Sequence, residues 1–433
     1  MHKENFEITL ENISKIEGHA DVDIKVKDGV VSDVRLKITE NKRFFTEVVR
    51  GKPAKAVHQI VSRICGTCSI AHLTACIQTV EDIYGCQPSD QTLLLRNLLL
   101  YGLNIRDHAM HLYLFCLPDL YGKDSILDFP DDDSYEHELV HKALDVKSVG
   151  NKLSIAVGGR AVHSPFPTVG GWIKIPKKEE LNALVPELKK VREYAIEFVK
   201  IFHDCSFSLE NPYQEYLALK NDDFSYLGKD LCSTEQYCIP KEQLLDHLER
   251  NVIPYSQALG FKFAGKPYIV GALARINLNV KSMHPKTKKD VEEYLKVFPS
   301  NNIFHNNLAQ AIEIINCIDR AIELIERYGE IPEKPPALLK PVKQEGIGVI
   351  EAPRGTLYYH LKVDEAGKIT YANLVIPTAQ NQIMMEKSIG IIVQNGLDKG
   401  MEKESIQHEV EKLIRAYDPC MSCATHFLKI KWM

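Results

Sequence analysis

The alternation of apolar and polar residues predicts strands at the start of the chain. Apolar residues alternate with charged ones from Val22 to Val26, and an apolar pattern returns between Val30 and Ile38. Between them, Lys27-Asp28-Gly29 is typical of a hairpin turn. We therefore expect strands within residues 6–39, as part of an N-terminal β element over residues 1–50.

Much of the remaining chain has helical spacing. Between residues 54 and 116, apolar residues recur at steps of three and four, so that they share one face of a helix. That face carries Leu94, Leu98, Tyr101, Ile105 and His108. Comparable spacing predicts further helices over residues 178–204, 307–328, 380–396 and 402–416. A Gly- and Pro-rich stretch, residues 163–176, is predicted to be an irregular connection.

A second hairpin is predicted near the other end of the chain. Residues 356–363 and 369–376 have strand composition, and Asp364-Glu-Ala-Gly367 forms the turn between them. We expect a second β element over residues 350–380. Although the length allows two or three domains, the pattern favours one intertwined unit over residues 1–433. The predicted fold class is α+β and mainly α, a body of long helices around a buried metal centre, with small peripheral β elements near the two ends.

The composition is that of an ordinary globular protein. Hydrophobic residues make up 45% and charged residues 26% of the chain, and the formal net charge is −5. No Lys/Arg cluster suggests a nucleic-acid or membrane surface. The start has no apolar signal region, and the most apolar stretch, residues 93–100, is too short to span a bilayer. We expect a soluble, cytoplasmic chain, although a partner subunit can also carry an export signal.

The cysteines carry the chemical information. There are 11, an odd number without a secretory signal, which argues against a disulfide framework. Four of them form two Cys-x-x-Cys pairs, Cys65 with Cys68 and Cys420 with Cys423. Two intervening residues allow both sulfurs of a pair to bind one metal, and thiolates prefer zinc, copper(I), nickel or iron.

The spacing leaves the identity of that metal open. A redox dithiol is disfavoured because the usual βαβ setting is missing. Structural zinc is the commonest use of two such pairs, but about 350 residues separate them here, far more than in zinc ribbons. An iron–sulfur cluster is disfavoured because there is no dense cysteine run, and Pro419 precedes a cysteine rather than following the last one.

The residues around the cysteines resemble those of nickel–iron hydrogenase large subunits. The first pair stands in Arg-Ile-Cys-Gly-Thr-Cys with a histidine four residues later, and the second in Asp-Pro-Cys-Met-Ser-Cys with a histidine three residues later. Three further segments match the family in order: residues 15–19 (KIEGH), 351–355 (EAPRG) and 375–378 (VIPT). Arg43-Phe44-Phe45 and the helix around His108 are most similar to the cytoplasmic NAD(P)-linked or sulfhydrogenase-type subgroup.

The resemblance implies reversible heterolytic cleavage of dihydrogen at a nickel–iron centre. Cys65, Cys68, Cys420 and Cys423 would bind nickel. Cys68 and Cys423 would also bridge to an iron that carries carbon monoxide and cyanide. Cys420 would take the proton and Glu17 would relay it outward, although Glu17 alone would read as a surface carboxylate.

The resemblance also assigns residues around the open face of the centre. Arg354 would lie over it, and Asp107 and Asp418 would balance the buried guanidinium. Without the resemblance, Asp107 would be interpreted as part of a solvated helix face. It lies 39 residues after Cys68, as in the family. Three cofactor-binding residues complete the implied site. Thr378 would hydrogen-bond a cyanide, His72 would donate to the sulfur of Cys68, and Pro353 belongs to the same shell.

A magnesium or similar ion is implied near the C-terminus, bound by His426 and the carbonyl of Leu374. Here the sequence departs from the family, whose glutamate ligand aligns with Thr46, one residue before Glu47. Either Glu47 binds the ion or the carboxylate ligand is lost. Family precursors are cleaved after this histidine, so we expect residues 427–433 to be removed by a maturation endopeptidase.

Electron transfer is expected to depend on partners. The other cysteines have no cluster spacing, so we expect no iron–sulfur cluster in this chain and interpret most of them as buried small hydrophobes; they are residues 76, 86, 116, 205, 232, 238 and 317. The resemblance implies an iron–sulfur small subunit, with flavin- and NAD(P)-binding diaphorase subunits beyond it. The chain has no Gly-x-Gly-x-x-Gly loop of its own.

Two rival functions remain open at this stage. The quinone subunit of respiratory complexes shares the fold but lacks these cysteines. A non-catalytic protein with structural zinc at the four thiolates would differ in its metal content. Neither nucleic-acid binding nor membrane insertion is expected.

Overall fold

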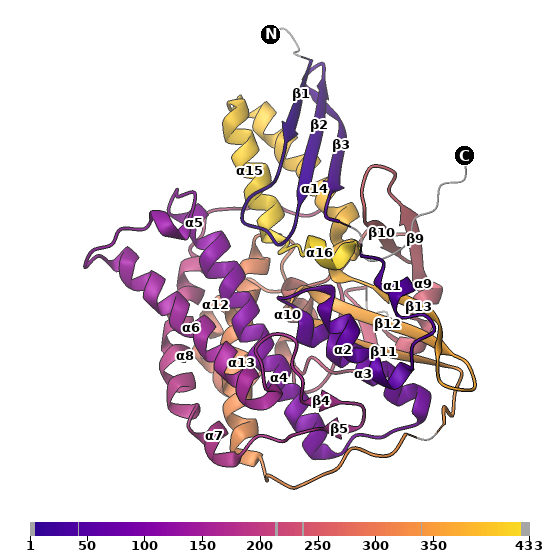
Figure 1. The fold of residues 1–433 in the computed structure, drawn as a ribbon. Coiled ribbons are helices and arrows are strands. Elements are labelled where there is room, and N and C mark those ends of the chain that lie inside the picture. The colour runs from indigo at the N-terminus through magenta and orange to yellow at the C-terminus, as the bar shows by residue number, and fades with distance from the viewer. Residues whose placement is uncertain (1–4, 42, 213–214, 236–237, 339, 426–433) are drawn as a thin grey trace.

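The computed structural model describes residues 5–41, 43–212, 215–235, 238–338 and 340–425 (Figure 1). The helices are α1 Phe45–Val48, α2 His58–Val61, α3 Ser69–Tyr84, α4 Asp90–Ala109, α5 Leu117–Leu120, α6 Tyr135–Gly158, α7 Lys178–Asn182, α8 Val185–His203, α9 Leu244–His247, α10 Ala272–Asn279, α11 Pro285–Asp290, α12 Glu292–Leu295, α13 His305–Arg327, α14 Pro377–Asp398, α15 Lys403–Ala416 and α16 Met421–Ala424. A π-helical segment, Met110–Cys116, continues α4.

Within the described ranges, the strands form five small sheets, in which neighbouring strands are antiparallel. They are β1 Phe6–Leu10, β2 Ala20–Lys27, β3 Val30–Ile38, β4 Pro167–Thr168, β5 Gly171–Trp172, β6 Leu217–Lys220, β7 Asp230–Ser233, β8 Cys238–Pro240, β9 Leu248–Val252, β10 Leu259–Phe263, β11 Glu345–Ala352, β12 Gly355–Val363 and β13 Ile369–Val375.

A bundle of long helices forms the body of the molecule. Helix α4 packs against α6 and α13, and α8 packs against α6 and α13 (Figure 1). Buried leucines and isoleucines fill the space between these helices, as the spacing of apolar residues predicted. The mainly helical α+β fold class is therefore confirmed.

Helix α6 was not predicted from the spacing of apolar residues. Its N-cap is Ser134, whose hydroxyl accepts a hydrogen bond from the His137 N–H, and its C-cap is Gly159, which has a left-handed backbone (φ 84°). Serine and glycine at these two positions are the usual helix-ending residues.

The N-terminal sheet joins the two ends of the chain. Strands β1, β2 and β3 form the predicted antiparallel sheet, and Lys27 pairs with Val30 across the predicted turn. The sheet lies beside α14, where Gln394 and Glu386 accept hydrogen bonds from the N–H groups of Val31 (2.9 Å) and Leu36 (3.0 Å) (Figure 1). The first and last parts of the chain therefore fold together.

The second sheet contains the predicted hairpin, β12 and β13, and a third strand, β11, that was not predicted. Strand β11 packs directly on α3. A Cβ atom at Gly348 would lie 2.3 Å from the Ala75 carbonyl oxygen, so only glycine permits this approach. The contact joins the segment that carries the first cysteine pair to the segment that carries Arg354.

Residues 205–285, which had no clear pattern, contain two small sheets, β6–β8 and β9–β10, and helix α10. Cys232 and Cys238 form a disulfide there, so the interpretation of these two as reduced small hydrophobes is wrong. They lie opposite each other in the β7–β8 pair, a register that the sequence did not reveal. Cys76, Cys116 and Cys317 are buried as free thiols, as expected. In the described part of the chain, no helix is long and apolar enough to cross a membrane.

Candidate metal centre

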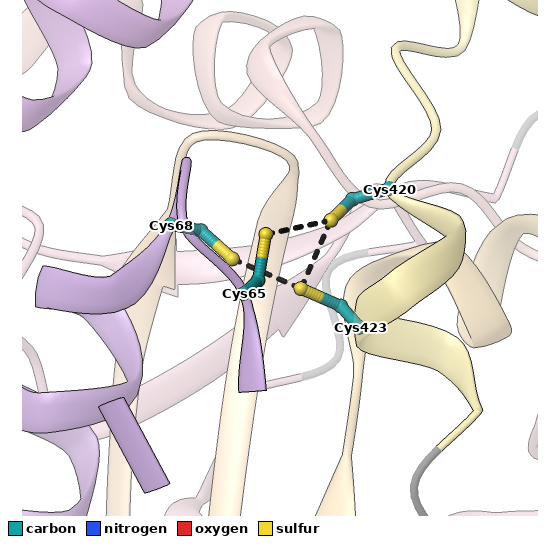
Figure 2. A group of neighbouring side chains, drawn as sticks. All are labelled: Cys65, Cys68, Cys420 and Cys423. Carbon is teal, nitrogen blue, oxygen red and sulfur yellow. Dashed lines mark hydrogen bonds between the residues drawn. The ribbon is translucent and has the colours of Figure 1, made fainter. Parts of the chain in front are cut away.

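The two cysteine pairs, one near each end of the chain, meet in the interior (Figure 2). Their four Sγ atoms lie within 4.8 Å of one another, and all four residues are buried. The Sγ of Cys420 is 3.3 Å from that of Cys65 and 3.0 Å from that of Cys423, and Cys423 Sγ is 2.9 Å from Cys68 Sγ. Among the described residues this is the one convergent set of three or more potential metal ligands.

Local turns place both pairs. Cys68 precedes the first turn of α3, and Cys420 precedes α16, which contains Cys423. The second pair is fixed from two sides: the Cys420 N–H donates to Thr378 Oγ1 (2.9 Å), and the Met421 N–H donates to the Glu17 carbonyl (2.9 Å). Gly18, at φ +82°, allows this approach, because a Cβ there would lie 2.8 Å from Met421 Cβ.

Four buried sulfur atoms this close together need a compensating cation if they are to lose their protons. Hydrogen bonds from the neighbouring thiols, Cys420 first, hold the pKa of Cys65 well below its usual range. Burial raises the pKa of Cys420 and Cys423 well above theirs. Four buried sulfurs cannot all become thiolates beside one another unless a positive ion compensates their charge. The donor set and its burial therefore fit a soft metal ion.

Glu17 contacts the second pair directly. Its Oε2 atom lies 3.0 Å from Cys420 Sγ and accepts a hydrogen bond from the Ser422 N–H at 3.1 Å. Burial, followed by the nearby Cys65, raises the pKa of Glu17. A carboxyl with a raised pKa that touches a ligating thiol is suited to proton exchange.

Arg354 lies between the two carboxylates that the sequence analysis selected. Its Nη1 is 2.6 Å from Asp107 Oδ2 and its Nη2 is 3.0 Å from Asp418 Oδ1. Burial opposes the charge of Arg354, but the two carboxylates outweigh it and raise its pKa well above the usual range. Asp107 is 1% exposed, so the solvated-face interpretation of this residue is wrong. Asp107 Oδ1 and Arg354 Nε are buried and have no hydrogen-bond partner among the described residues.

A narrow cavity joins these groups. It is bordered by the sulfurs of Cys68, Cys420 and Cys423, by the polar side chains of His72, Arg354 and Thr378, and by an apolar wall of Ala352, Leu357, Ile376 and Pro377. The space open to the centre of a water molecule is about 10 Å³. The unpaired Arg354 Nε belongs to a side chain that lines this cavity. Sulfur ligands, polar donors and an apolar wall together suit a small metal group with compact ligands.

The cofactor-binding candidates lie around this cavity. His72 Nε2 is 3.4 Å from Cys423 Sγ, whereas the prediction named Cys68 as its partner. Thr378 accepts a hydrogen bond from Cys420, which leaves its hydroxyl proton for another acceptor. Pro353 is buried, and its carbonyl accepts a hydrogen bond from Arg275 at 3.0 Å.

The magnesium candidates that the structure describes lie on two elements in contact, Glu47 on α1 and Leu374 on β13. Glu47 is exposed and its carboxylate pairs with Arg50 at 3.0 Å, whereas Thr46 beside it is buried. Leu374 is buried in β13 opposite Tyr359. His426 and residues 427–433 lie outside the described residues. Magnesium binding therefore stays a prediction.

Two supporting contacts were missed by the sequence analysis. Tyr359 OH lies 2.7 Å from His72 Nδ1, and Thr67 Oγ1 lies 3.1 Å from Cys65 Sγ. Thr67 was recognisable because it stands inside the first motif. Tyr359 gave no signal, because its contact depends on how β12 packs on α3.

Comparison with known sequences identifies relatives over nearly the whole chain. The family described as "Nickel-dependent hydrogenase" matches residues 43–131 and 234–426, and a family described as "HoxL-like" matches residues 7–41. The alpha subunit of sulfhydrogenase 1 from Pyrococcus furiosus is 34% identical over 429 residues, which cover 98% of each chain. A chain of the F420-non-reducing hydrogenase from Methanothermobacter thermautotrophicus is 31% identical, over 97% of this chain and 94% of its own length.

Solved structures show the same fold. An NAD+-reducing NiFe hydrogenase in the H2-reduced state superposes with a TM-score of 0.84 at 24% identity, covering 97% of this chain and 99% of its own. The NiFeSe hydrogenase of Dm. baculatum superposes with a TM-score of 0.77 at 21% identity, covering 98% of this chain and 100% of its own.

Proposed function

The chain belongs to the nickel-dependent hydrogenase family, and on that premise we propose that its four cysteines bind a nickel–iron centre that cleaves dihydrogen reversibly and heterolytically. The chain is the large subunit of a hydrogenase, an oxidoreductase that acts on dihydrogen. The observation that carries the proposal is the convergence of four buried sulfurs with Glu17 at one and Arg354 nearby.

The cysteines divide the work of holding the metals. Cys65, Cys68, Cys420 and Cys423 would bind nickel, and Cys68 and Cys423 would also hold an iron with carbon monoxide and cyanide. When bound, this centre supplies the redox chemistry that cleaves the H–H bond. The cavity beside Cys68 and Cys423 suits the iron and its small ligands, and Thr378 offers its hydroxyl proton there.

Glu17 would move the proton. Cys420 Sγ would accept the proton of dihydrogen, whose electron pair would stay with the bound centre, and would pass that proton to Glu17 Oε2, 3.0 Å away. The pKa of Glu17 is raised toward neutrality, where a carboxyl can both accept and release a proton. The Ser422 N–H donates to the same oxygen, which keeps it directed at the sulfur.

Arg354 would act at the cavity side. Its guanidinium, held by Asp107 and Asp418, places a positive charge beside Cys68 and Cys420 without freedom to turn away. Such a fixed charge can polarise a substrate as charge develops. His72 would donate from Nε2 toward Cys423 and so moderate the basicity of that sulfur.

Electrons would leave through partners. We infer an iron–sulfur small subunit, with electrons passing on to NAD(P) or a similar carrier through flavin-containing subunits. In support, the relatives in Pyrococcus furiosus are named as alpha subunits, which implies further subunits, and one structural neighbour is named as NAD+-reducing. Maturation by an endopeptidase and a cytoplasmic location remain predictions from the sequence.

One experiment tests the centre. Purified complex is analysed for nickel, iron and zinc, and its infrared spectrum is recorded on the same sample. About one nickel per chain with bands of metal-bound carbon monoxide and cyanide is the expected result. Zinc at the four cysteines without such bands, in a fully matured complex, would exclude the proposal and leave a structural metal protein.

A further inference from the structure

A chain of buried side chains leads from Asp418 away from the cavity. Asp418 Oδ2 accepts from Gln310 Nε2 at 2.7 Å, and Gln310 Oε1 lies 2.6 Å from His111 Nδ1. The other ring nitrogen, His111 Nε2, lies 2.7 Å from the backbone carbonyl oxygen of Arg415. The side chains of Asp418, Gln310 and His111 are at most 2% exposed, so bulk solvent does not reach these contacts.

The orientation of the Gln310 amide is fixed by Asp418. The other oxygen of that carboxylate forms the ion pair with Arg354, so the group is ionised and can only accept. A glutamine oxygen placed 2.7 Å from a carboxylate oxygen would be repelled, so the amide nitrogen must face Asp418. The amide oxygen then faces His111, and the hydrogen between Gln310 and Nδ1 has to come from the histidine.

The second ring nitrogen of His111, Nε2, must also carry a hydrogen. A backbone carbonyl can only accept, so the 2.7 Å contact to Arg415 needs a hydrogen on Nε2. The Cys116 thiol lies 3.3 Å from the same nitrogen, a longer contact with a weak donor, and cannot replace that hydrogen bond. A neutral imidazole carries one N–H, whereas this site requires two.

We propose that His111 is a buried imidazolium that holds Asp418 in place through Gln310 and thereby positions Arg354. It is a positioning residue, because its partners are Gln310, Arg415 and Cys116 rather than the four clustered cysteines or the cavity. With His111 charged, the buried carboxylate of Asp418 has two cations near it, Arg354 at 3.0 Å and His111 at 3.8 Å. Asp418 also has a left-handed backbone (φ 48°), so its position depends on such support.

Neutron diffraction tests the charge directly. Crystals of the matured complex, exchanged into heavy water, should show deuterium on both Nδ1 and Nε2 of His111. Deuterium on one nitrogen alone would overturn the proposal. The result does not depend on which metal the cysteines bind.

Variants test the positioning role, which rests on the proposed function. In His111→Gln, which removes the charge, we expect kcat for H2 oxidation to fall roughly tenfold with little change in KM. The carbon monoxide and cyanide bands should shift at unchanged nickel content. His111→Lys keeps a cation with several donors and should restore the band positions at least in part.

His305→Gln is the matched control. It replaces a half-buried histidine on α13, the helix that carries Gln310, and should leave the bands and kcat unchanged. Bands in His111→Gln that coincide with those of the unmodified complex would overturn the positioning role. If the unmodified complex lacks the bands altogether, the proposed function fails, while the deuterium result still decides the charge of His111.

Discussion

Two buried arginines, Arg275 and Arg354, lie near each other but have different surroundings. Arg275 donates to Glu313 from Nε and Nη2 at 2.7 Å each, to Glu351 at 3.1 Å, and to the carbonyls of Ala352 and Pro353, which directly precede Arg354. Every nitrogen of its guanidinium therefore has a partner. Arg354 has its two carboxylates, yet its Nε has no partner in the described part of the chain and its side chain borders the cavity.

The difference indicates that Arg275 has a structural role and that Arg354 belongs to the functional site. A buried guanidinium whose nitrogens all have partners has no donor left for a ligand, so its effect is to fix geometry. Here it fixes the carbonyls of the two residues that precede Arg354. An unsaturated buried network carries a cost unless a ligand completes it. We therefore expect changes near Arg275 to affect stability and changes near Arg354 to affect activity.

The largest effect is expected from Arg354→Lys. A lysine cannot bridge Asp107 and Asp418 with the same planar fork, so the charge at the cavity moves. We expect H2-dependent dye reduction to fall about 100- to 1,000-fold, while the melting temperature changes little. Arg50→Lys, which alters an exposed ion pair, is the control and should retain activity. A large loss of stability in Arg354→Lys would mean that Arg354, like Arg275, mainly stabilises the fold, and the proposed difference between the two arginines would be wrong.

The opposite result is expected from Glu313→Gln. It leaves Arg275 buried with less compensating charge, which costs about 3–5 kcal/mol when a buried pair is broken. Denaturant-induced unfolding of the complex should shift to lower concentration, and the fraction that still binds nickel should keep a nearly normal turnover per nickel. Normal stability with lost turnover would show that the Arg275 network acts in catalysis.

Acid titration sharpens this prediction. Burial opposes the charge of Glu313, but Arg275 outweighs it and lowers its pKa from 4.5 to about 2. A carboxylate with a lowered pKa stabilises the fold fully above pH 4.5, and that stabilisation declines as the pH falls toward 2. The unmodified protein should therefore lose stability across this window, and Glu313→Gln should lose less. Equal slopes would mean that Glu313 is not held ionised by Arg275.

The sequence predicted the local parts of this arrangement better than the distant ones. The turn at Asp28-Gly29 and the hairpin after Thr356 depend on neighbouring residues, and both formed as expected. Helix α6 was missed although its end residues, Ser134 and Gly159, are local signals. Strand β11 was missed because its pairing and its packing on α3 are not local.

The site followed the same rule. Motif resemblance selected the cysteines, Glu17, Arg354 and the two aspartates, and the structure brings these residues together. The Arg275 network and the Gln310–His111 chain were not predicted, because Arg275, Glu313 and Gln310 stand outside the matched motifs and far from them in the sequence. Contacts of this kind are set by helix packing, which a single sequence does not reveal.

A smaller effect is expected from Glu17→Gln. An amide can still accept from the Ser422 N–H, so the local fold should persist, but it cannot carry a proton. We expect H2 oxidation and hydrogen–deuterium exchange with solvent to fall roughly 100-fold. Glu17→Asp keeps a carboxyl and should recover part of the rate. Glu7→Gln, at an exposed carboxylate, should have no effect. Unchanged exchange in Glu17→Gln would assign the proton path to another group.

The smallest effect is expected from Tyr359→Phe, a change to a saturated contact within the site. Burial keeps the pKa of Tyr359 well above its usual range, so its hydroxyl remains protonated and can donate to His72 Nδ1 at 2.7 Å. That hydrogen bond leaves the ring proton on Nε2, which faces Cys423. Without it the other tautomer becomes accessible, and we expect roughly tenfold lower activity and a shift of the infrared bands.

The neighbouring residue offers a matched control for this last change. Tyr358 is equally buried on β12, but its hydroxyl has no hydrogen-bond partner among the described residues. Tyr358→Phe should therefore leave the bands, the activity and the nickel content unchanged. Equal effects from both changes would mean that β12 tolerates no alteration of packing, and that the hydroxyl of Tyr359 has no specific role. An effect from Tyr359→Phe alone would show that a saturated contact can also belong to the site when it directs a proton toward a ligating sulfur.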